Sequence, residues 1–341
     1  MNLADLNKVA KAMVASGRGI LAADESTGTI KKRFDAIGVE STADSRRDYR
    51  ELLFRSTEAM SKYISGVILY DETIWQKAKD GTPLVEIIKH NGAIPGIKVD
   101  EGTKPLPRCP GELITIGLDK LTDRLPKYRE QGARFAKWRA VIDIGPHIPS
   151  FTGVHTNTHA LARYAALCQA ADLVPIVEPE VLMDGDHDID RCYEVTEWVL
   201  KETFQQLYQQ RVALEGMVLK PNMVVPGQKS AKKASVEEVA EKTVKLLREC
   251  VPAAVPGIAF LSGGQSDEEA TAHLDAINKL GNLPWSLTFS YGRALQAAPQ
   301  KAWSGKSENV AAAQRAFSHR ARMNGLAMLG QWKADLEKKA A

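Results

Sequence analysis

The sequence has few cysteines, almost no net charge and no long hydrophobic run. Its 341 residues include four cysteines without a CxxC pair, which is typical of free thiols in a reducing compartment. Lys and Arg number 45 against 42 Asp and Glu, and a formal net charge of +3 predicts no nucleic-acid or membrane partner. The most nonpolar stretch, 251–261, is broken by Pro252, Pro256 and Gly257, so we expect no membrane span. The first residues lack the apolar core of a signal peptide, and we therefore expect a soluble, cytoplasmic protein.

Composition and length are typical of an ordinary globular protein. Hydrophobic residues make up 44% and charged residues 26%, close to the values of globular proteins. At about 150 residues per domain the length allows two domains, but a single α/β barrel can also absorb it.

Eight short runs rich in β-branched residues alternate with longer, charged segments. The runs cover residues 19–25, 66–72, 93–100, 133–144, 173–181, 215–222, 257–264 and 286–292. Helical spacing of apolar residues lies between them, for example at 45–60, 158–172 and 235–250. Alternation of strand and helix predicts a parallel sheet, and eight such units predict an α/β fold of the single (β/α)8 TIM barrel type.

No linker or low-complexity tract divides the chain. We therefore expect one barrel domain over residues 1–341, with an N-terminal helix at about 3–16 and a C-terminal tail from about 331. The proline-rich stretch 102–111 and the basic stretch 228–235 are interpreted as loops after the third and sixth strands.

Charged residues gather where the predicted strands end. In a barrel, the carboxyl ends of the strands and the loops after them carry the active site. The charged residues at these ends are Asp24, Glu72, Lys98, Lys137, Arg139, Glu178, Glu180, Lys220 and Arg293. Lys137 and Arg139 are two apart, as are Glu178 and Glu180, so each pair faces one side of its strand. A single such charge is more often a solvent-facing or salt-bridged residue, but convergence of both signs on one face favours a site.

Lys220 is the strongest nucleophile candidate. It follows the apolar run MVL and precedes Pro221 at the end of the sixth strand. An ordinary lysine is almost fully protonated at pH 7. Burial disfavours the charged form, and the like charges of Lys137 and Arg139 act in the same direction. A neutral amine of this kind can attack a carbonyl and form a Schiff base. On local sequence alone, a lysine that reaches out to solvent is an equally good interpretation.

The last two strands end in small and hydroxyl residues. Ser262, Gly263 and Gly264 follow the seventh strand, and Ser290, Gly292 and Arg293 close the eighth. Loops at these two positions of a barrel often bind phosphate through backbone N–H groups. One Ser-Gly-Gly turn alone is weak support, but two such turns at the right strands predict a phosphate site.

Metal and thiol chemistry have weaker signals. His155 and His159 are four apart and could face one metal ion from a helix, but no HExxH motif is present. His187 lies among acidic residues and could bind a divalent ion. Ordinary polar histidines explain both patterns better, and the cysteines lack a flanking base motif.

Long strings of the sequence resemble the class I, Schiff-base fructose-bisphosphate aldolases. These strings are ILAADEST (20–27), GIKVD (96–100), AKWR (136–139), VPIVEPE (174–180), LKPNMV (219–224), FLSGGQS (260–266) and LTFSYGRAL (287–295). They occur in the family's order from about residue 15 to residue 330. The resemblance implies reversible cleavage of fructose 1,6-bisphosphate to dihydroxyacetone phosphate and glyceraldehyde 3-phosphate, in glycolysis and gluconeogenesis.

The resemblance also implies residue roles. Lys220 would form the imine, Glu178 would be the acid and base of carbinolamine dehydration, and Asp24 would take the C4 hydroxyl proton. Glu180 would hold the lysine network, and Lys137 would keep Lys220 neutral and stabilise developing charge. One substrate phosphate would be bound by Ser262, Gly263, Gly264, Ser290, Gly292 and Arg293. The other phosphate end would be served by Arg33 and Lys98, with Ser26 and Lys32 nearby, and Arg139 would line the site.

No cofactor and no metal are implied, because the imine itself accepts the electrons of the broken bond. The resemblance further implies a homo-oligomer, a tetramer in the family. One departure concerns the C-terminus: animal and plant members end in a tyrosine that protonates the enamine, whereas the last tyrosine here is Tyr291. Three alternatives stay open, namely an aldol enzyme for a related sugar phosphate, a metal-dependent aldolase, and a scaffold that binds polyanions or cytoskeletal proteins.

Overall fold

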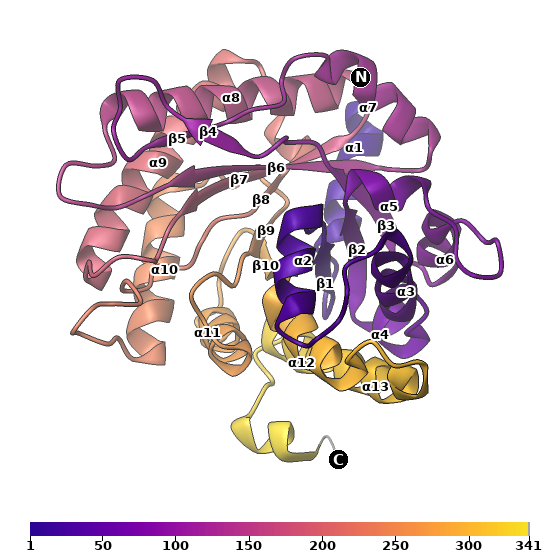
Figure 1. The fold of residues 1–341 in the computed structure, drawn as a ribbon. Coiled ribbons are helices and arrows are strands. Elements are labelled where there is room, and N and C mark those ends of the chain that lie inside the picture. Colours follow the sequence, from indigo (N-terminus) through magenta and orange to yellow (C-terminus); the bar gives the residue numbers. More distant parts are fainter. Residues whose placement is uncertain (340–341) are drawn as a thin grey trace.

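Eight parallel strands close into a barrel at the centre of the molecule, and helices surround it (Figure 1). The computed structural model describes residues 1–339. Around the barrel the order is β1, β10, β9, β8, β7, β6, β3 and β2. The barrel strands are β1 (Gly19–Ala23), β2 (Ile64–Leu69), β3 (Ile94–Lys98), β6 (Phe135–Ile142), β7 (Val174–Val181), β8 (Val218–Leu219), β9 (Gly257–Phe260) and β10 (Ser286–Tyr291). All eight predicted strands are therefore confirmed, and so is the (β/α)8 barrel.

The helices connect successive strands. They are α1 (Leu3–Met13), α2 (Thr27–Asp35), α3 (Ala43–Phe54), α4 (Thr57–Lys62), α5 (Asp71–Trp75), α6 (Leu84–His90), α7 (Leu121–Glu130), α8 (Phe151–Ala170), α9 (Ile189–Gln209), α10 (Val236–Cys250), α11 (Asp267–Lys279), α12 (Arg293–Trp303) and α13 (Val310–Met328). Short 3₁₀ helices are η1 (Leu214–Gly216), η2 (Ser307–Asn309) and η3 (Ala334–Lys339). Residues 340 and 341 of the predicted tail lie outside the described residues.

Three predicted helices differ from the structure at their ends. The segment 45–60 is divided into α3 and α4, because the Ser56 hydroxyl donates to the Leu52 carbonyl at 3.0 Å and competes with the helical ladder. The helix expected from 158 begins at Phe151, where the Ser150 hydroxyl accepts from the Gly153 N–H at 3.0 Å. The N-terminal helix expected at about 3–16 ends at Met13.

We had predicted that the stretch 102–111 is a loop, but it also contains a short strand. Its residues Thr103–Pro105 form β4, which pairs antiparallel with β5 (Leu113–Thr115) outside the barrel. All three β4 residues are exposed, so neither apolar residues nor an apolar–polar alternation marks the strand in the sequence.

Helix α1 covers the end of the barrel where the strands begin. Its residues Leu6, Ala10 and Met13 belong to one buried cluster with residues of the barrel strands such as Phe135 and Val174, which begin β6 and β7. A Cβ on Gly257, the first residue of β9, would lie 2.6 Å from the side chain of Val14. This end is therefore filled, and the carboxyl ends of the strands are left for a site.

The two short ladders at β8 set where the sixth barrel strand stops. Only Val218 and Leu219 pair with β7, and Pro221 cannot donate a further backbone hydrogen bond. The side chain of Asn222 takes over, accepting from the Val181 N–H at 3.0 Å. Lys220 is thereby fixed at the carboxyl end of β8.

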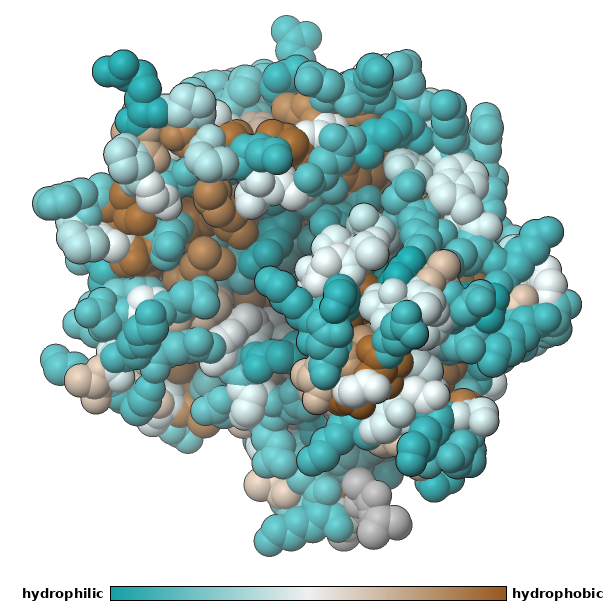
Figure 2. All heavy atoms as spheres, viewed as in Figure 1, coloured by the Kyte–Doolittle hydropathy of each residue, from teal (hydrophilic) through white to brown (hydrophobic). Residues whose placement is uncertain are grey.

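Most of the face seen in Figure 2 is hydrophilic, and hydrophobic residues gather mainly near α8 and α9. A small cluster that includes Ile142, Val154 and Val195 lies in this part of the fold. Within residues 1–339, no helix is long and apolar enough to cross a membrane.

Candidate active site

Four predicted catalytic residues form one continuous chain of charges inside the barrel. The Lys220 Nζ lies 3.1 Å from Glu178 Oε1, and the Lys137 Nζ lies 3.2 Å from Glu178 Oε2. Lys137 also donates to Asp24 Oδ2 at 3.1 Å. These residues come from β6, β7 and the ends of β1 and β8, and the side chains of both lysines and Glu178 are 4–6% exposed. Glu178 is therefore shared between two lysines, which the sequence did not predict.

Burial and neighbouring charge act against each other in this chain. Burial alone would raise the pKa of Asp24, but Lys137, Lys220 and Lys98 lower it well below the usual value. The same competition lowers the pKa of Glu178, where Lys137 and Lys220 are the main attractive charges. Burial would lower the pKa of Lys137, but Asp24 and Glu178 raise it. Both carboxyl groups are thus ionised near neutral pH, and Lys137 is a cation.

Glu180 has a different partner from the one predicted. Its side chain, 6% exposed, forms an ion pair with the half-exposed Arg139 guanidinium. This pair raises the pKa of Arg139 against the effect of burial. Glu180 therefore anchors an arginine at the rim of the site rather than a lysine.

A hollow of about 310 Å³ opens at this face of the barrel. Predicted residues that line it are Asp24, Ser26, Arg33, Lys98, Lys137, Arg139 and Gly292. Predicted Lys32 is exposed on α2 and is not among the lining residues. The hollow also contains Glu25 and Asp100, which the sequence analysis missed. Each is next to or two residues from a predicted residue, in ADE and in KVD, and this proximity was the available signal.

Glu25 and Asp100 hold the basic residues of the hollow. Glu25 is 7% exposed, pairs with Arg33 and accepts from the Gln296 amide at 2.7 Å. Asp100 Oδ1 lies 3.4 Å from the Lys98 Nζ. The first turn of α2 adds Ser26, whose hydroxyl caps the helix at the Thr29 N–H. A helix N-terminus beside arginine and lysine is a suitable place for an anion.

The turns after β9 and β10 leave little room for side chains. A Cβ on Gly263 would lie 3.0 Å from Glu180 Oε1 and 2.9 Å from Met183 Cε. Gly264 has a positive φ of 74°, and its Cβ would lie 2.2 Å from Met183 Cγ. The left-handed backbone and the close Met183 side chain therefore require glycine at position 264.

Hydroxyl groups near these turns are buried. Ser262 is 6% and Ser290 1% exposed, and the Ser290 Oγ has no hydrogen-bond partner among the described residues. A buried hydroxyl without a partner suits an incoming oxyanion. A Cβ on Gly292 would lie 3.8 Å from Arg33 Nη2, so Arg33 stands beside this turn although we had assigned it to the other phosphate.

Two of the three histidine candidates have local partners, whereas the ring nitrogens of His187 are buried without one among the described residues. His155 Nδ1 lies 2.9 Å from Glu202, and His159 Nδ1 lies 2.9 Å from Gln206 on α9. Burial lowers the pKa of His187, although three aspartates oppose it. In the part of the chain that the structure describes, no group of three or more His, Cys, Asp or Glu residues could hold a metal ion. All four cysteines are free thiols.

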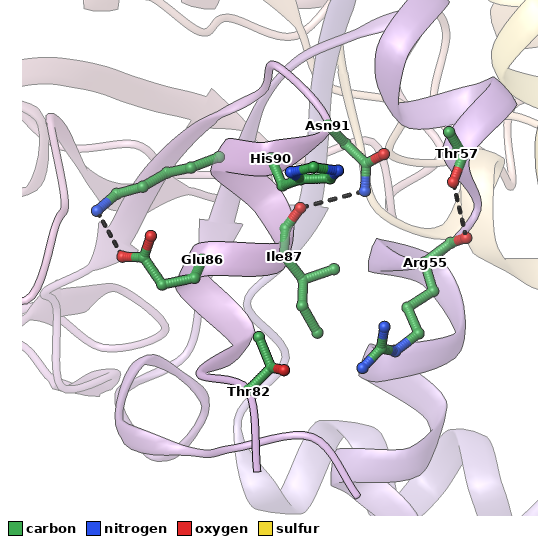
Figure 3. Close-up of a pocket in the computed structure, with 8 residues that line it drawn as sticks. Arg55, Thr57, Thr82, Glu86, Ile87, His90 and Asn91 are labelled. Carbon is green, nitrogen blue, oxygen red and sulfur yellow. Dashed lines mark hydrogen bonds and ion pairs between the residues drawn. The ribbon is translucent and has the colours of Figure 1, made fainter. Parts of the chain in front are cut away.

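Another surface hollow lies elsewhere, between the end of α3, the start of α4 and α6 (Figure 3). Its volume is about 730 Å³. Its charged groups are already satisfied: Lys89 pairs with Glu86 at 2.8 Å, and Arg55 pairs with Glu51 and Asp80. Asn91 donates to the Ile87 carbonyl, as Figure 3 shows. The volume of this hollow does not by itself indicate a site. Its charged side chains already form ion pairs with neighbouring residues, and exposed pairs of this kind carry little energy.

The predicted tail is attached to the outside of the barrel. Glu337 in η3 accepts from Arg320 and from the Trp332 indole, and lies 2.9 Å from the His319 Nε2. The Trp332 N–H donates to Asp275 on α11 at 2.9 Å. The last tyrosine, Tyr291, is fully buried and donates to the Ala270 carbonyl.

Comparison with known proteins shows the family of this chain. The sequence matches the family described as fructose-bisphosphate aldolase class-I over residues 5–341. It is 59% identical over 334 residues to a probable fructose-bisphosphate aldolase class 1 of Xanthomonas campestris pv. campestris, covering 98% of this chain and all of the relative. It is 56% identical to the cytosolic fructose-bisphosphate aldolase 4 of Arabidopsis thaliana, covering 94% of this chain and 82% of that protein.

A solved structure is similar over nearly the whole chain. The fructose-bisphosphate aldolase of Plasmodium falciparum, in complex with TRAP and a small-molecule inhibitor, superposes with a TM-score of 0.96 at 49% identity. The match covers 97% of this chain and 96% of that one. With the shared carboxylate and the two lysines on the same barrel face, these similarities lead to one conclusion: the chain belongs to the class I fructose-bisphosphate aldolases, lyases that reversibly cleave fructose 1,6-bisphosphate to dihydroxyacetone phosphate and glyceraldehyde 3-phosphate without a metal ion.

Proposed function

We propose that Lys220 forms the imine with the substrate ketone and that Glu178 moves the protons of this step. The observation that carries the proposal is the Glu178 carboxylate shared between Lys220 and Lys137, at 3.1 and 3.2 Å. The Lys220 nitrogen gives one proton to Glu178 and attacks the carbonyl carbon as a neutral amine, and a second proton then passes from this nitrogen to the former carbonyl oxygen to give the carbinolamine. Protonated Glu178 returns this proton to the carbinolamine hydroxyl, water leaves, and the iminium ion forms.

Removal of the charge on Lys220 helps Glu178 to take up the proton that it later donates. While both lysines are cations, they keep the pKa of Glu178 low. When the Lys220 nitrogen becomes a neutral amine or carbinolamine, Glu178 loses one of these two attractive charges, and its buried carboxyl binds a proton more readily. The carboxyl can therefore accept the proton and release it within a single step of the cycle.

Asp24 is proposed as the base for carbon–carbon cleavage. It takes the proton from the C4 hydroxyl, the C3–C4 bond breaks, and the bonding electrons enter the iminium to form an enamine. Its low pKa keeps the carboxylate ready as acceptor. Lys137, 3.1 Å from Asp24, stabilises the negative charge that develops on the C4 oxygen.

Two groups of residues would bind the phosphates. The first consists of Ser262, Gly263, Gly264, Ser290, Gly292 and Arg293 at the ends of β9 and β10. The second consists of Lys98 with Ser26 at the head of α2, and Arg33 stands between the groups beside Gly292. Lys32, which is exposed on α2, is kept only as an outer contact of the second group.

Protonation of the enamine does not need a C-terminal tyrosine in this proposal. Tyr291 is committed to the Ala270 carbonyl, and the described tail is attached to α11 and α13. We propose Glu178, next to the imine nitrogen, or water as the proton source, and solvent exchange at C3 in a Glu178→Gln variant would separate them.

We further propose that residues 1–341 form one domain, that the protein works in the cytoplasm and that it assembles into a homo-oligomer. The cytosolic Arabidopsis relative and the four free thiols support the location. The barrel strands, which run from residue 19 to residue 291 in one closed sheet, support the single domain.

The test is reductive trapping of the imine. The protein is mixed with dihydroxyacetone phosphate, with and without EDTA, reduced with borohydride and mapped by peptide mass spectrometry. We expect one adduct on Lys220 in both samples and none in Lys220→Arg. An adduct on another lysine would refute the assignment of the nucleophile, and cleavage activity that EDTA abolishes would refute the metal-free mechanism.

A further inference from the structure

The turn between β9 and α11 is closed by a hydrogen bond of Gln265, a residue that has no part in the proposed mechanism. Gln265 lies in this turn, is 5% exposed, and donates its backbone N–H to the Ser262 carbonyl at 3.3 Å. This hydrogen bond closes the turn around Gly263 and Gly264. The position of Gln265 therefore determines where the proposed phosphate-binding backbone points.

The side chain of Gln265 contacts a buried histidine. Its Oε1 lies 2.6 Å from the Nδ1 of His273, which is on α11 and is 8% exposed. An amide oxygen can only accept, so Nδ1 carries the proton. Burial lowers the pKa of His273, although Glu269 opposes this, and the ring is therefore neutral near pH 7 with its proton fixed on the side of Gln265.

The backbone of Gln265 contacts the second phosphate-binding turn. Its carbonyl oxygen accepts from Arg293 Nη2, at the start of α12. Gln265 thus connects three parts: the Ser-Gly-Gly turn through its N–H, Arg293 through its carbonyl, and α11 through its side chain. If the Gln265 side chain lost its hydrogen bond to His273, the positions of both the 262–264 turn and the Arg293 side chain would be less fixed.

We propose that His273 is a positioning residue for phosphate binding, acting through Gln265 on the 262–264 turn and on Arg293. The inference rests on the proposed function of these residues as a phosphate site. The Gln265–His273 pair lies on the side of the turn that faces α11. It therefore acts on affinity for the phosphate-bearing substrate and leaves the chemistry at Lys220 unchanged.

The test uses three substitutions of one residue. Asparagine places an N–H donor close to the position of Nδ1, whereas glutamine places it close to the position of Nε2, and alanine places none. For His273→Ala we expect the KM for fructose 1,6-bisphosphate to rise about fivefold, the effect of one ordinary hydrogen bond, with kcat changed less than about twofold. His273→Asn should restore most of the affinity, and His273→Gln should not.

A matched control is available on the outer helices. His159 Nδ1 lies 2.9 Å from Gln206 Oε1, a histidine–glutamine pair away from the site. His159→Ala should leave KM unchanged. Gln265→Ala should raise KM as His273→Ala does, and the double variant should be no worse than either single variant, because both act through one contact.

Three outcomes would overturn the inference. The first is an unchanged KM in His273→Ala while Arg293→Ala raises it, which would leave the phosphate site intact and remove only the role of His273. The second is equal loss in the asparagine and glutamine variants, which would indicate packing rather than a directed hydrogen bond. The third is an unchanged KM in both Arg293→Ala and His273→Ala, which would refute the phosphate site itself.

Discussion

The two walls of the active site are built from opposite materials. The wall formed by β6, β7 and β8 carries buried charges that are bound to one another, with Glu178 between Lys137 and Lys220. The wall formed by the turns after β9 and β10 is made mainly of glycine and serine, and its Ser290 hydroxyl has no partner among the described residues. Proton transfer requires groups that already touch, whereas binding a phosphate requires donors that are still free. The comparison predicts that damage to the first wall lowers kcat and damage to the second raises KM.

The largest expected effect is at Lys220. Lys220→Arg keeps the positive charge beside Glu178 but cannot form an imine, so we expect kcat to fall on the order of 10⁴-fold or more. Steady-state cleavage of fructose 1,6-bisphosphate measures this. Lys89→Arg, in the surface hollow of Figure 3, is the matched control and should retain full activity. Substantial turnover in Lys220→Arg would contradict the assignment of covalent catalysis to the first wall.

Glu178→Gln should have the next largest effect. The amide keeps the size of the side chain but cannot carry the proton between Lys220 and the carbinolamine, so kcat should fall by about 10²- to 10⁴-fold. Single-turnover kinetics with borohydride quenching should show slow imine formation. Glu86→Gln, which changes a glutamate paired with a lysine at the surface, should be neutral. Fast imine formation in Glu178→Gln would contradict the proton route.

On the second wall, Ser290→Ala should raise KM about five- to tenfold and leave kcat within about twofold of its original value. The reason is that the buried hydroxyl has no partner in the described residues until an anion arrives. Stability should change little, which thermal unfolding would verify. A drop in kcat at unchanged KM would erase the contrast between the walls.

The smallest effect concerns acid stability. The pKa of Asp24 is lowered in the folded protein, so its contribution to stability is present above the ordinary carboxyl range of about pH 4 and is lost as pH falls toward the folded value. Asp24→Asn removes this dependence. Urea unfolding between about pH 3 and pH 7 should therefore show a shallower loss of stability in the variant, and parallel curves would contradict the charge chain.

The fold could be predicted from the sequence because apolar residues recur with different spacing in strands and in helices. All eight barrel strands follow short apolar runs, and the runs of β1, β3, β6 and β10 contain or end at residues that line the hollow. The exposed strand β4 was missed because none of its three residues is buried, so it shows no apolar face. The interruption at Ser56 was missed because a hydroxyl bonded to the preceding turn leaves no trace in periodicity.

The site was predictable by type but not by pairing. Strand-end charges identified Lys137, Glu178 and Lys220, yet the pattern of strand ends does not indicate which carboxylate contacts which lysine. Glu180 was expected with the lysines and instead binds Arg139. The Gln265–His273 contact joins a turn to the helix after it, and neither residue carries a motif that marks it.

The most direct test of the account traps the reaction in Asp24→Asn. Because this variant keeps Lys220 and Glu178 but lacks the base for the C4 hydroxyl, fructose 1,6-bisphosphate should form the imine and stop before the C3–C4 bond breaks. After borohydride reduction, mass spectrometry should find the six-carbon bisphosphate adduct on Lys220, where the unmodified enzyme gives the three-carbon adduct as well. A three-carbon adduct alone, or no adduct on Lys220, would contradict the division of roles between Asp24 as the base and Lys220 as the residue that forms the imine.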